Sequence, residues 1–252
     1  MKKNLFYFLF ALFTLISVSC TDRLSLPSIE RNDRDKPSVQ GQPYKWNKSK
    51  CSPIYKKTLP YLRNGDPNFS MEDIIFWVGN GSKKAALVIE WHDGKKPDAL
   101  VWGYRWDGDA YGIDMLRAIV KADKRLIFLT HFTKYGNTIA GVGYNINMTG
   151  EHYLIHKDSK HIPINGVIET NAYDYDEWTY ADTADHWLSG WYNGYWSYWV
   201  KDDYNEDWNY SNWGASNREL VDGSWDGWSF LDDMNIWTGK PLGNKFIPAS
   251  IN

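Results

Sequence analysis

The sequence predicts a mainly β protein, an antiparallel β-sandwich or jelly-roll-like fold with one short helix. From residue 74 onward, short runs of β-branched and aromatic residues alternate with turn signals rich in Gly, Asn and Asp. Aromatic residues make up 17% of the chain, a share that suits a β-rich core or a ligand-stacking surface. Only one segment has helical periodicity, which argues against a parallel sheet of alternating strands and helices.

The expected elements follow in chain order. Each expected strand is a short run that ends at a turn signal, and these runs are residues 74–78, 85–91, 99–106, 125–130, 138–146, 195–200, 208–213 and 228–231. The helix is expected at residues 112–123, where Asp114 places a favourable negative charge in the first turn. Four apolar residues fall on one face of that helix: Met115, Leu116, Ile119 and Val120.

The first twenty residues have the composition of a secretory signal. Lys2 and Lys3 provide a positive start, and residues 5–16 form an apolar run of 12 residues that is too short to span a bilayer. Small residues at 17–19 precede Cys20 and resemble a bacterial lipobox, so we expect Cys20 to be the acylated first residue of the mature chain. An ordinary signal peptide that ends near a cysteine is the alternative.

Three parts are expected along the chain. Residues 1–19 are the signal peptide, and residues 20–43, which are polar and contain proline, are a flexible tether. Residues 44–252 are expected to form a single β-rich ligand-binding domain, since a segment of this length can bury a core of its own. Lipidation of Cys20 leaves Cys51 without a disulfide partner, and we expect Cys51 to be an inert thiol.

The distribution of charge excludes one class of partner. The chain has 28 basic and 31 acidic residues and lacks an arginine-rich block, so nucleic acid is not an expected partner. Residues 171–237 hold 14 of the acids against only Lys201 and Arg218. The same segment carries 10 of the 15 tryptophans, and we expect it to form a specialised face of one domain.

The strand expected at residues 99–106 places three aromatic rings on one face. Trp102, Tyr104 and Trp106 alternate along the strand and point the same way, while Arg105 points the other way. This face is either buried in the core or a stacking platform for a planar ligand. All four residues are therefore candidate ligand contacts.

A second aromatic run lies in the acidic segment. Its rings exceed what one strand face can bury, and Trp and Tyr provide large contact areas at a low cost in side-chain entropy. We expect some of them to contact a ligand or a partner protein, the alternative being a tightly packed aromatic core. The candidate ligand-binding residues of this segment are Trp187, Trp191, Tyr192, Tyr195, Trp196, Trp199, Trp225 and Trp228.

A weak Ca²⁺ pattern occurs in the same segment. Asp203, Asn205 and Asp207 provide oxygen ligands at alternate positions, but Trp208 and Gly214 stand where a Ca²⁺ loop needs glycine and glutamate. Three histidines could bind a metal only from a helix, which the neighbouring Gly and Pro disfavour: His152, His156 and His161. No cofactor is required by these patterns, and Ca²⁺ is retained only as a weak candidate.

The common catalytic motifs are absent from the sequence, among them G-x-S-x-G, H-E-x-x-H and the P-loop. A glycosidase needs only two carboxylates at a set separation, which a sequence does not reveal. The eligible acids are more often turn formers than catalysts: Glu90, Asp93, Asp98, Asp107 and Asp226. The sequence therefore favours a binding protein over an enzyme.

Three stretches resemble a family of exported bacterial proteins. They are residues 76–93, which begin FWVGNGS, residues 99–108, which contain WGYRWDG, and residues 222–230, which contain DG-x-x-DGW. The family carries the same WGYRWDG signature and late DG-x-x-DGW motif, and the resemblance covers roughly residues 74–235. Members in Bacteroidota are surface lipoproteins. The resemblance implies a location at the outer membrane or cell surface, and an association with TonB-dependent uptake of corrinoids such as vitamin B12.

On this basis we expect a lipid-anchored surface protein that captures a nutrient, first of all a corrinoid, and delivers it to an outer-membrane transporter. Aromatic rings would stack on the ligand, while Asp, Asn and Arg105 would orient its polar groups. Two alternatives stay open. One is a carbohydrate-binding lipoprotein, because sugars also stack on Trp and Tyr, and the other is a glycoside-active enzyme.

Overall fold

A computed structural model describes residues 66, 68–134, 136–148, 152–192, 194–203, 207–231, 242 and 245–251. These residues belong to one compact unit of the chain. The predicted signal peptide, the tether, Cys20 and Cys51 lie outside the described residues. Within the described part of the chain, no helix is both long and apolar enough to cross a membrane.

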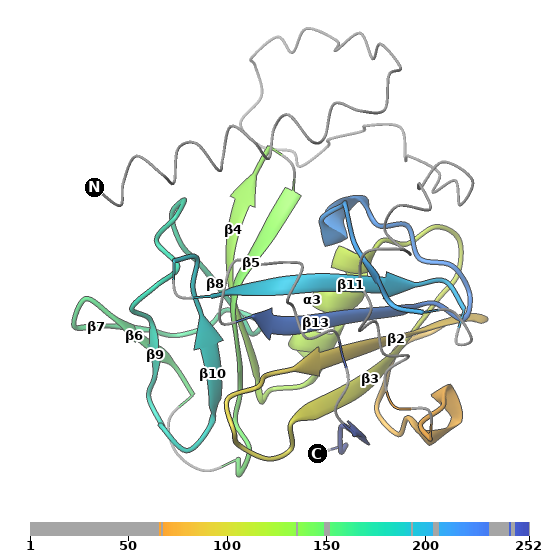
Figure 1. The fold of residues 1–252 in the computed structure, drawn as a ribbon, viewed down its shortest axis with the longest axis horizontal. Coiled ribbons are helices and arrows are strands. Elements are labelled where there is room, and N and C mark those ends of the chain that lie inside the picture. The colour runs from red at the N-terminus through yellow and green to blue at the C-terminus, as the bar shows by residue number, and fades with distance from the viewer. Residues whose placement is uncertain are drawn as a thin grey trace, which may run out of the picture. The chain divides into compact units, whose positions relative to one another are not determined.

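The described residues form a mainly β fold with one α-helix, as predicted, and its centre is a seven-stranded sheet, here called the large sheet (Figure 1). Six strands lie in the order β1-β3-β2-β13-β11-β12, and a further strand, β14, pairs with β3. Their bounds are β1 Trp77–Gly79, β2 Lys83–Glu90, β3 Ala99–Trp106, β11 Tyr195–Lys201, β12 Asn209–Tyr210, β13 Trp225–Leu231 and β14 Phe246–Pro248.

The pairing within the large sheet is mixed and not purely antiparallel. β2 pairs with β3, and β11 with β13, in the antiparallel sense that neighbouring runs of sequence predict. β13 however pairs with β2 in parallel, and so do β1 and β14 with β3. Parallel neighbours need long connections, and the β2–β13 pair joins segments more than a hundred residues apart. Short-range turn signals could not predict these pairs.

Two smaller sheets complete the fold. The four-stranded sheet has the order β10-β5-β4-β8, and in Figure 1 its strands β4 and β5 run crosswise to β11 and β13. Its bounds are β4 Leu126–Thr133, β5 Gly136–Tyr144, β8 Val167–Glu169 and β10 His186–Ser189. The three-stranded sheet has the order β7-β6-β9, with β6 Leu154–His156, β7 Ser159–His161 and β9 Thr179–Tyr180. Two short 3₁₀ helices are η1 Met71–Asp73 and η2 Ala215–Asn217.

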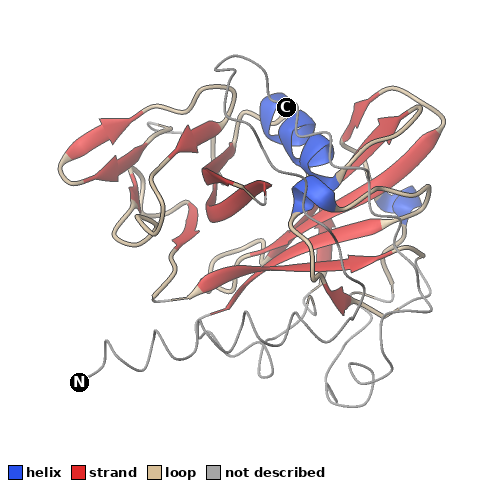
Figure 2. Cartoon of the chain, turned by 90° about the horizontal axis from the view of Figure 1, so that it is seen from above, coloured by secondary structure: helices blue, strands red, loops and turns tan. Residues whose placement is uncertain are grey.

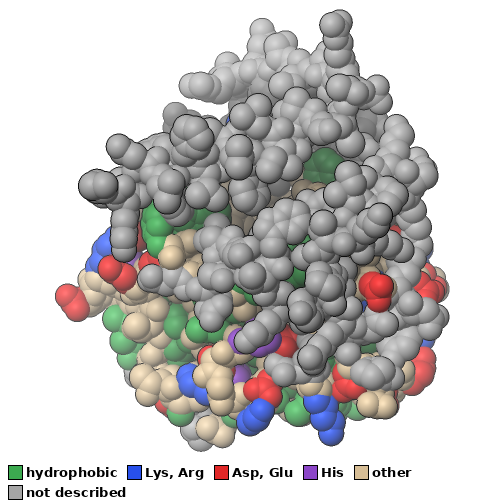
Figure 3. Space-filling view, viewed as in Figure 1, with side chains coloured by type: hydrophobic (Ala, Val, Ile, Leu, Met, Phe, Trp, Pro, Cys, Tyr) green, Lys and Arg blue, Asp and Glu red, His purple; other side chains and the backbone are tan. Residues whose placement is uncertain are grey.

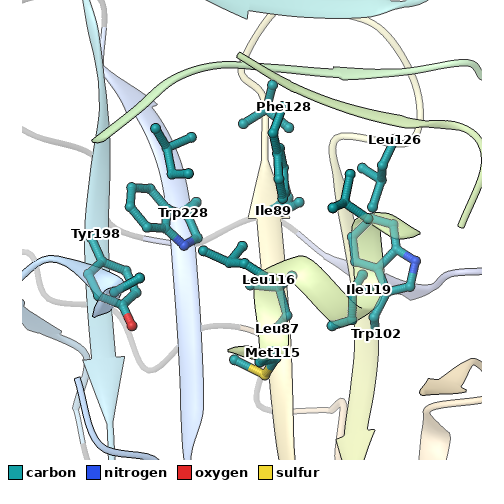
Figure 4. Packing of buried hydrophobic residues seen from close by; sticks show 14 of the residues in the cluster. Leu87, Ile89, Trp102, Met115, Leu116, Ile119, Leu126, Phe128, Tyr198 and Trp228 are labelled. Carbon is teal, nitrogen blue, oxygen red and sulfur yellow. The ribbon is translucent and has the colours of Figure 1, made fainter. Parts of the chain in front are cut away.

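The helix α3, Gly112–Ala122, lies where the sequence predicts it. Its first turn is capped by Asp114, whose carboxylate accepts a hydrogen bond of 2.9 Å from the backbone N–H of Tyr111. The predicted apolar face is buried, and Figure 4 shows its residues packed against Leu87 of β2 and Trp102 of β3. The helix therefore covers one face of the large sheet.

Both faces of the large sheet are covered. In β2, Leu87 and Ile89 join the cluster that includes α3 and the four-stranded sheet, while the alternate residues Ala86 and Val88 join a second cluster on the other face. The third apolar cluster lies between the four-stranded and three-stranded sheets. A strand that is buried on both faces has no solvent-facing side, and this fact decides where most of the aromatic rings lie.

Candidate functional site

The WGYRWDG segment forms β3, with the facing that the sequence predicts. Trp102, Tyr104 and Trp106 all pack on the side of the large sheet that faces α3, and the guanidinium of Arg105 lies on the other side, 4.7 Å from the ring centre of Trp77. Trp102 and Trp106 are buried, and the indole N–H of Trp102 donates to a carboxylate oxygen of Asp123 at 2.9 Å. The structure therefore favours the core alternative for these two tryptophans, whereas Tyr104 and Arg105 are half-buried.

The rings of β11 and β13 are also core residues. Trp196 and Trp228 face α3, while Trp199 and Trp225 face the second cluster on the opposite side of the sheet. Tyr195 is buried as well. We expected some of these rings to lie outside the core because we assumed that only one face of each strand is covered. Both faces of the large sheet are covered, so rings on either face are buried. In this structure these five residues offer no open ring face to a ligand.

A buried polar network occupies the junction of β11, β13 and α3. The hydroxyl of Tyr198 donates to Asp226 Oδ2, and the guanidinium of Arg218 lies 3.3 Å from Asp226 Oδ1 and 2.7 Å from Asp202 Oδ1. Burial raises the pKa of Asp226, and the charge of Arg218 opposes that rise. A Cβ on Gly112 would stand 2.5 Å from the Tyr198 oxygen, so the helix needs glycine here. Asp226 is a structural acid enclosed in the core.

The metal candidates are described only in part, and two of the three candidate histidines, His156 and His161, lie with their ring centres 6.5 Å apart. Asp203 and Asp207 are exposed, and Asn205 lies outside the described residues. Across the residues that the structure describes, no three His, Cys, Asp or Glu side chains are arranged to hold a metal ion. Of the histidines, His156 stacks on Trp178 with the ring centres 4.3 Å apart.

One group of rings does reach solvent, and we call it the aromatic surface: Tyr173, Trp191 and Tyr192. Tyr173 and Tyr192 are 53% and 61% exposed, and Trp191 is half-buried between them and the core. The rings of Tyr173 and Trp191 meet edge to face, 5.9 Å apart. Figure 3 shows hydrophobic side chains reaching the surface over the region where Figure 1 labels β6, β9 and β10. Exposed aromatic groups of this kind mark contact sites.

Asp176 holds the aromatic surface in shape. Its carboxylate accepts hydrogen bonds of 3.2 Å from the backbone N–H groups of Trp191 and Tyr192. A Cβ on Gly190 would stand 2.9 Å from Asp176 Oδ1, so glycine is what allows the carboxylate this close. Tyr173 has a φ of 62°, a left-handed conformation that costs free energy for a residue with a side chain. Strain of this kind is concentrated at ligand-contacting loops.

The residues beneath the aromatic surface are packed core residues. Trp191 meets Tyr175 edge to face at 6.2 Å, and Tyr175 belongs to the third apolar cluster. Trp187 also packs against that cluster, and its indole N–H donates to the backbone oxygen of Trp178 at 2.7 Å. Of the twelve predicted ligand contacts, Trp187, Trp191 and Tyr192 are thus the three that the structure brings together at this surface.

The sequence analysis did not predict a second group of polar side chains, because His92, Asp93 and Gly94 are residues typical of a turn. His92 has a left-handed φ of 60°, and its Nε2 lies 2.9 Å from Ser229 Oγ and 3.4 Å from Glu90 Oε1. A nucleophilic triad would need the serine and the acid on opposite ring nitrogens. Glu90 and Ser229 are buried, and both contact the same nitrogen of His92, so they position its ring.

Beside it, Asp93 ties the β2–β3 loop to the four-stranded sheet. Its carboxylate oxygens lie 2.9 and 3.0 Å from Nδ1 of the buried His186. The His186 ring stacks on Trp91 with a centre distance of 4.5 Å, and Trp91 donates to the backbone oxygen of Val142. These contacts hold the β2–β3 loop of the large sheet against the four-stranded sheet.

Comparisons with protein families, with curated proteins and with solved structures find no match for this chain.

Proposed function

We propose that this chain is an exported lipoprotein, anchored through Cys20 at the outer membrane or cell surface, that captures a nutrient on its aromatic surface. The observation that carries the proposal is the group of exposed rings Tyr173, Trp191 and Tyr192. They are supported from below by packed aromatic residues and braced by the carboxylate of Asp176. A surface fixed before the ligand arrives loses little entropy on binding.

The first ligand that we propose is a corrinoid such as vitamin B12, delivered onward to a TonB-dependent outer-membrane transporter. Aromatic side chains would contact the apolar parts of the ring, and acids at the rim would accept hydrogen bonds from its amide substituents. The acids that we propose for that second task are Asp176 and its exposed neighbour in the chain, Glu177. No catalytic step is part of the proposal.

A glycan is the second candidate, and one observation favours it. The planes of Tyr173 and Trp191 are inclined by 65°, so the aromatic surface offers separate ring faces and not one flat floor. Separate faces suit several small sugar rings, each stacked on one aromatic side chain with acids near its hydroxyl groups.

Equilibrium binding of cyanocobalamin and of an oligosaccharide panel distinguishes the two ligands. Tyr192→Ala should weaken the bound ligand's affinity about tenfold, on the scale measured for aromatic stacking. Trp213→Ala removes another exposed ring and is the matched control, for which affinity should stay unchanged. Equal effects of the two substitutions, or binding of neither ligand class, would count against the aromatic surface as the site.

The anchor has a separate test. Cys20→Ala should move the protein from membranes to the soluble fraction without changing its folded circular dichroism spectrum, because the acyl chains supply the membrane affinity. Retention of the variant in membranes at the wild-type level would contradict lipidation at Cys20.

A further inference from the structure

One end of the four-stranded sheet carries exposed apolar side chains on adjacent loops. It is the end where β4, β8 and β10 begin and β5 ends. Ile162 and Ile164 precede β8 and are 70% and 78% exposed, and Met148, shortly after β5, is 56% exposed. Three large apolar side chains at one end exceed what scattered surface residues explain.

The loop that holds the two isoleucines is fixed against the helix. A Cβ on Gly166 would stand 2.5 Å from Val120 of α3, and the oxygen of Gly166 accepts a hydrogen bond of 2.8 Å from the backbone N–H of Phe128 in β4. Ile164 forms a β-bridge with Val167. The loop of the two isoleucines therefore lies next to the C-terminal end of α3.

Three lysines lie on the neighbouring segments. Lys121 and Lys124 are exposed at the end of α3, and Lys124 Nζ donates to the backbone oxygen of Lys121 at 2.7 Å. Lys160, in β7, lies over the ring of Tyr153 at 3.7 Å. We call this set the basic apolar end: Lys121, Lys124, Met148, Lys160, Ile162 and Ile164.

Acids are sparse at this end but present, because the loop that precedes β10 carries the half-buried Asp182 and the buried Asp185, whose Oδ1 accepts a hydrogen bond from the backbone N–H of Ile146. The other described loops of this end are residues 121–126, 145–148 and 159–166. The one acid in these ranges is Asp123, which is buried and pairs with the guanidinium of Arg125 at 2.7 Å. The guanidinium of Arg125 in turn donates to the backbone oxygen of Ser250, and Figure 2 shows α3, the longer of the blue helices, against the strands of the large sheet.

The basic apolar end and the aromatic surface lie at opposite ends of the same strands. β8 begins at Val167 beside α3 and leads to the loop of Tyr173, and β10 begins at His186 and leads to Trp191. The strands between the two ends are short, three residues in β8 and four in β10, so about 10 Å of extended chain lies between them. Lysines gather at one end, and the acids Asp176 and Glu177 at the other.

We propose that the basic apolar end docks on an anionic lipid surface. Ile162 and Ile164 would enter the boundary between headgroups and acyl chains, and the lysines would meet the lipid phosphates. Docking in this orientation points the aromatic surface away from the bilayer and toward solvent. The inference is independent of which ligand that surface binds.

The pattern fits lipid better than a protein partner. The core of a protein interface is depleted of charged residues, whereas here lysines are interleaved with the apolar side chains. Apolar and basic groups side by side are what an interfacial membrane contact requires, because the two types of group sit at different depths in one headgroup layer.

An environment-sensitive fluorophore tests the contact directly. The full chain, with Cys20→Ser and Cys51→Ser so that no acyl chain supplies membrane affinity and the probe has one site, carries Ile162→Cys labelled with the probe and is mixed with vesicles of phosphatidylcholine with phosphatidylglycerol. Emission should shift to the blue and rise severalfold, and spin-labelled lipids should quench it. The same probe at Ile75→Cys, an isoleucine that is 52% exposed near β1, is the matched control and should not respond.

Charge reversal supplies a second variant that leaves the probe site untouched. Lys121→Glu with Lys124→Glu should abolish most of the emission change at residue 162, and pure phosphatidylcholine vesicles should give the same loss. The proposal is overturned if the probe at residue 162 emits as it does in buffer. It is equally overturned if residues 75 and 162 respond alike, or if neither lipid charge nor the two lysines matter.

Discussion

The large sheet and the aromatic surface are built from the same run of sequence, yet they use its rings in opposite ways. Trp196 and Trp199 in β11 are buried, while Trp191 and Tyr192, a few residues earlier, form an exposed surface. β11 lies inside a sheet covered on both faces, whereas residues 191 and 192 stand in a turn at the end of the four-stranded sheet. The position in the fold, and not the density of aromatic residues, decides which ring meets a ligand.

The largest expected effect is a loss of folding stability when a buried ring of the large sheet is removed. Trp102→Ala should lower the free energy of unfolding by about 3–5 kcal/mol, because it empties a core site and leaves Asp123 without the indole donor. Tyr192→Ala should change it by less than about 0.5 kcal/mol, since the ring is mostly exposed. Urea denaturation of the two variants measures both, and similar losses would erase the distinction between the two regions.

The polar network of the core should show the next largest effect. Arg218→Met removes the cation beside the enclosed carboxylate of Asp226, at a cost of about 3 kcal/mol. Adding Asp226→Asn removes the unpaired charge and should recover a large part of that loss. Thermal or urea unfolding checks both variants, and a double variant no more stable than the single one would show that charge is not the cause.

A smaller effect is expected in the loop that shapes the aromatic surface. Gly190→Ala forces the carboxylate of Asp176 away from the backbone of Trp191, which should cost about 1–2 kcal/mol of stability and weaken ligand binding. Gly223→Ala is the control, because a Cβ there meets nothing within 4 Å although φ is positive. Unchanged ligand affinity in the Gly190 variant would mean that Asp176 does not hold the surface in shape.

The smallest expected effect is a pH dependence of stability at the contact between the β2–β3 loop and the four-stranded sheet. Burial raises the pKa of Asp93, but the hydrogen bond and charge of His186, with help from Lys95, lower it overall. The folded protein then binds this proton less readily than the unfolded chain, so the stabilisation is present above the ordinary value of 3.8 and is lost as pH falls below it. In urea unfolding at several pH values, the advantage of wild type over Asp93→Asn should shrink below about pH 4.

Local chemistry made much of the fold predictable. The helix was found because its apolar residues recur at helical spacing and Asp114 caps its first turn, and β3 was found because its residues alternate between two faces. The strand expected at 208–213 shrinks to the two residues of β12, and the short strands β6 to β10 were not predicted. Runs of two to four residues are too short for a period to be recognised.

The candidate site was predictable only in part. Trp191 and Tyr192 were named from the sequence, but Tyr173 and Asp176 were not, since nothing local links residues 173 and 176 to a turn about fifteen positions later. The link is a carboxylate that meets two backbone N–H groups of another loop. Such a contact exists only once both loops are placed by the sheets behind them.

The sequence by itself determined the mainly β class, the single helix, the facing of the WGYRWDG strand and the concentration of acids and aromatic rings in residues 171–237. Each follows from spacing along the chain, which fixes how side chains point in a helix or a strand. The tertiary structure decided which faces are covered. Parallel pairing of β13 with β2 placed part of the acidic segment at the centre of the large sheet, so most of its described tryptophans became core, while the aromatic surface and Trp213 remained exposed.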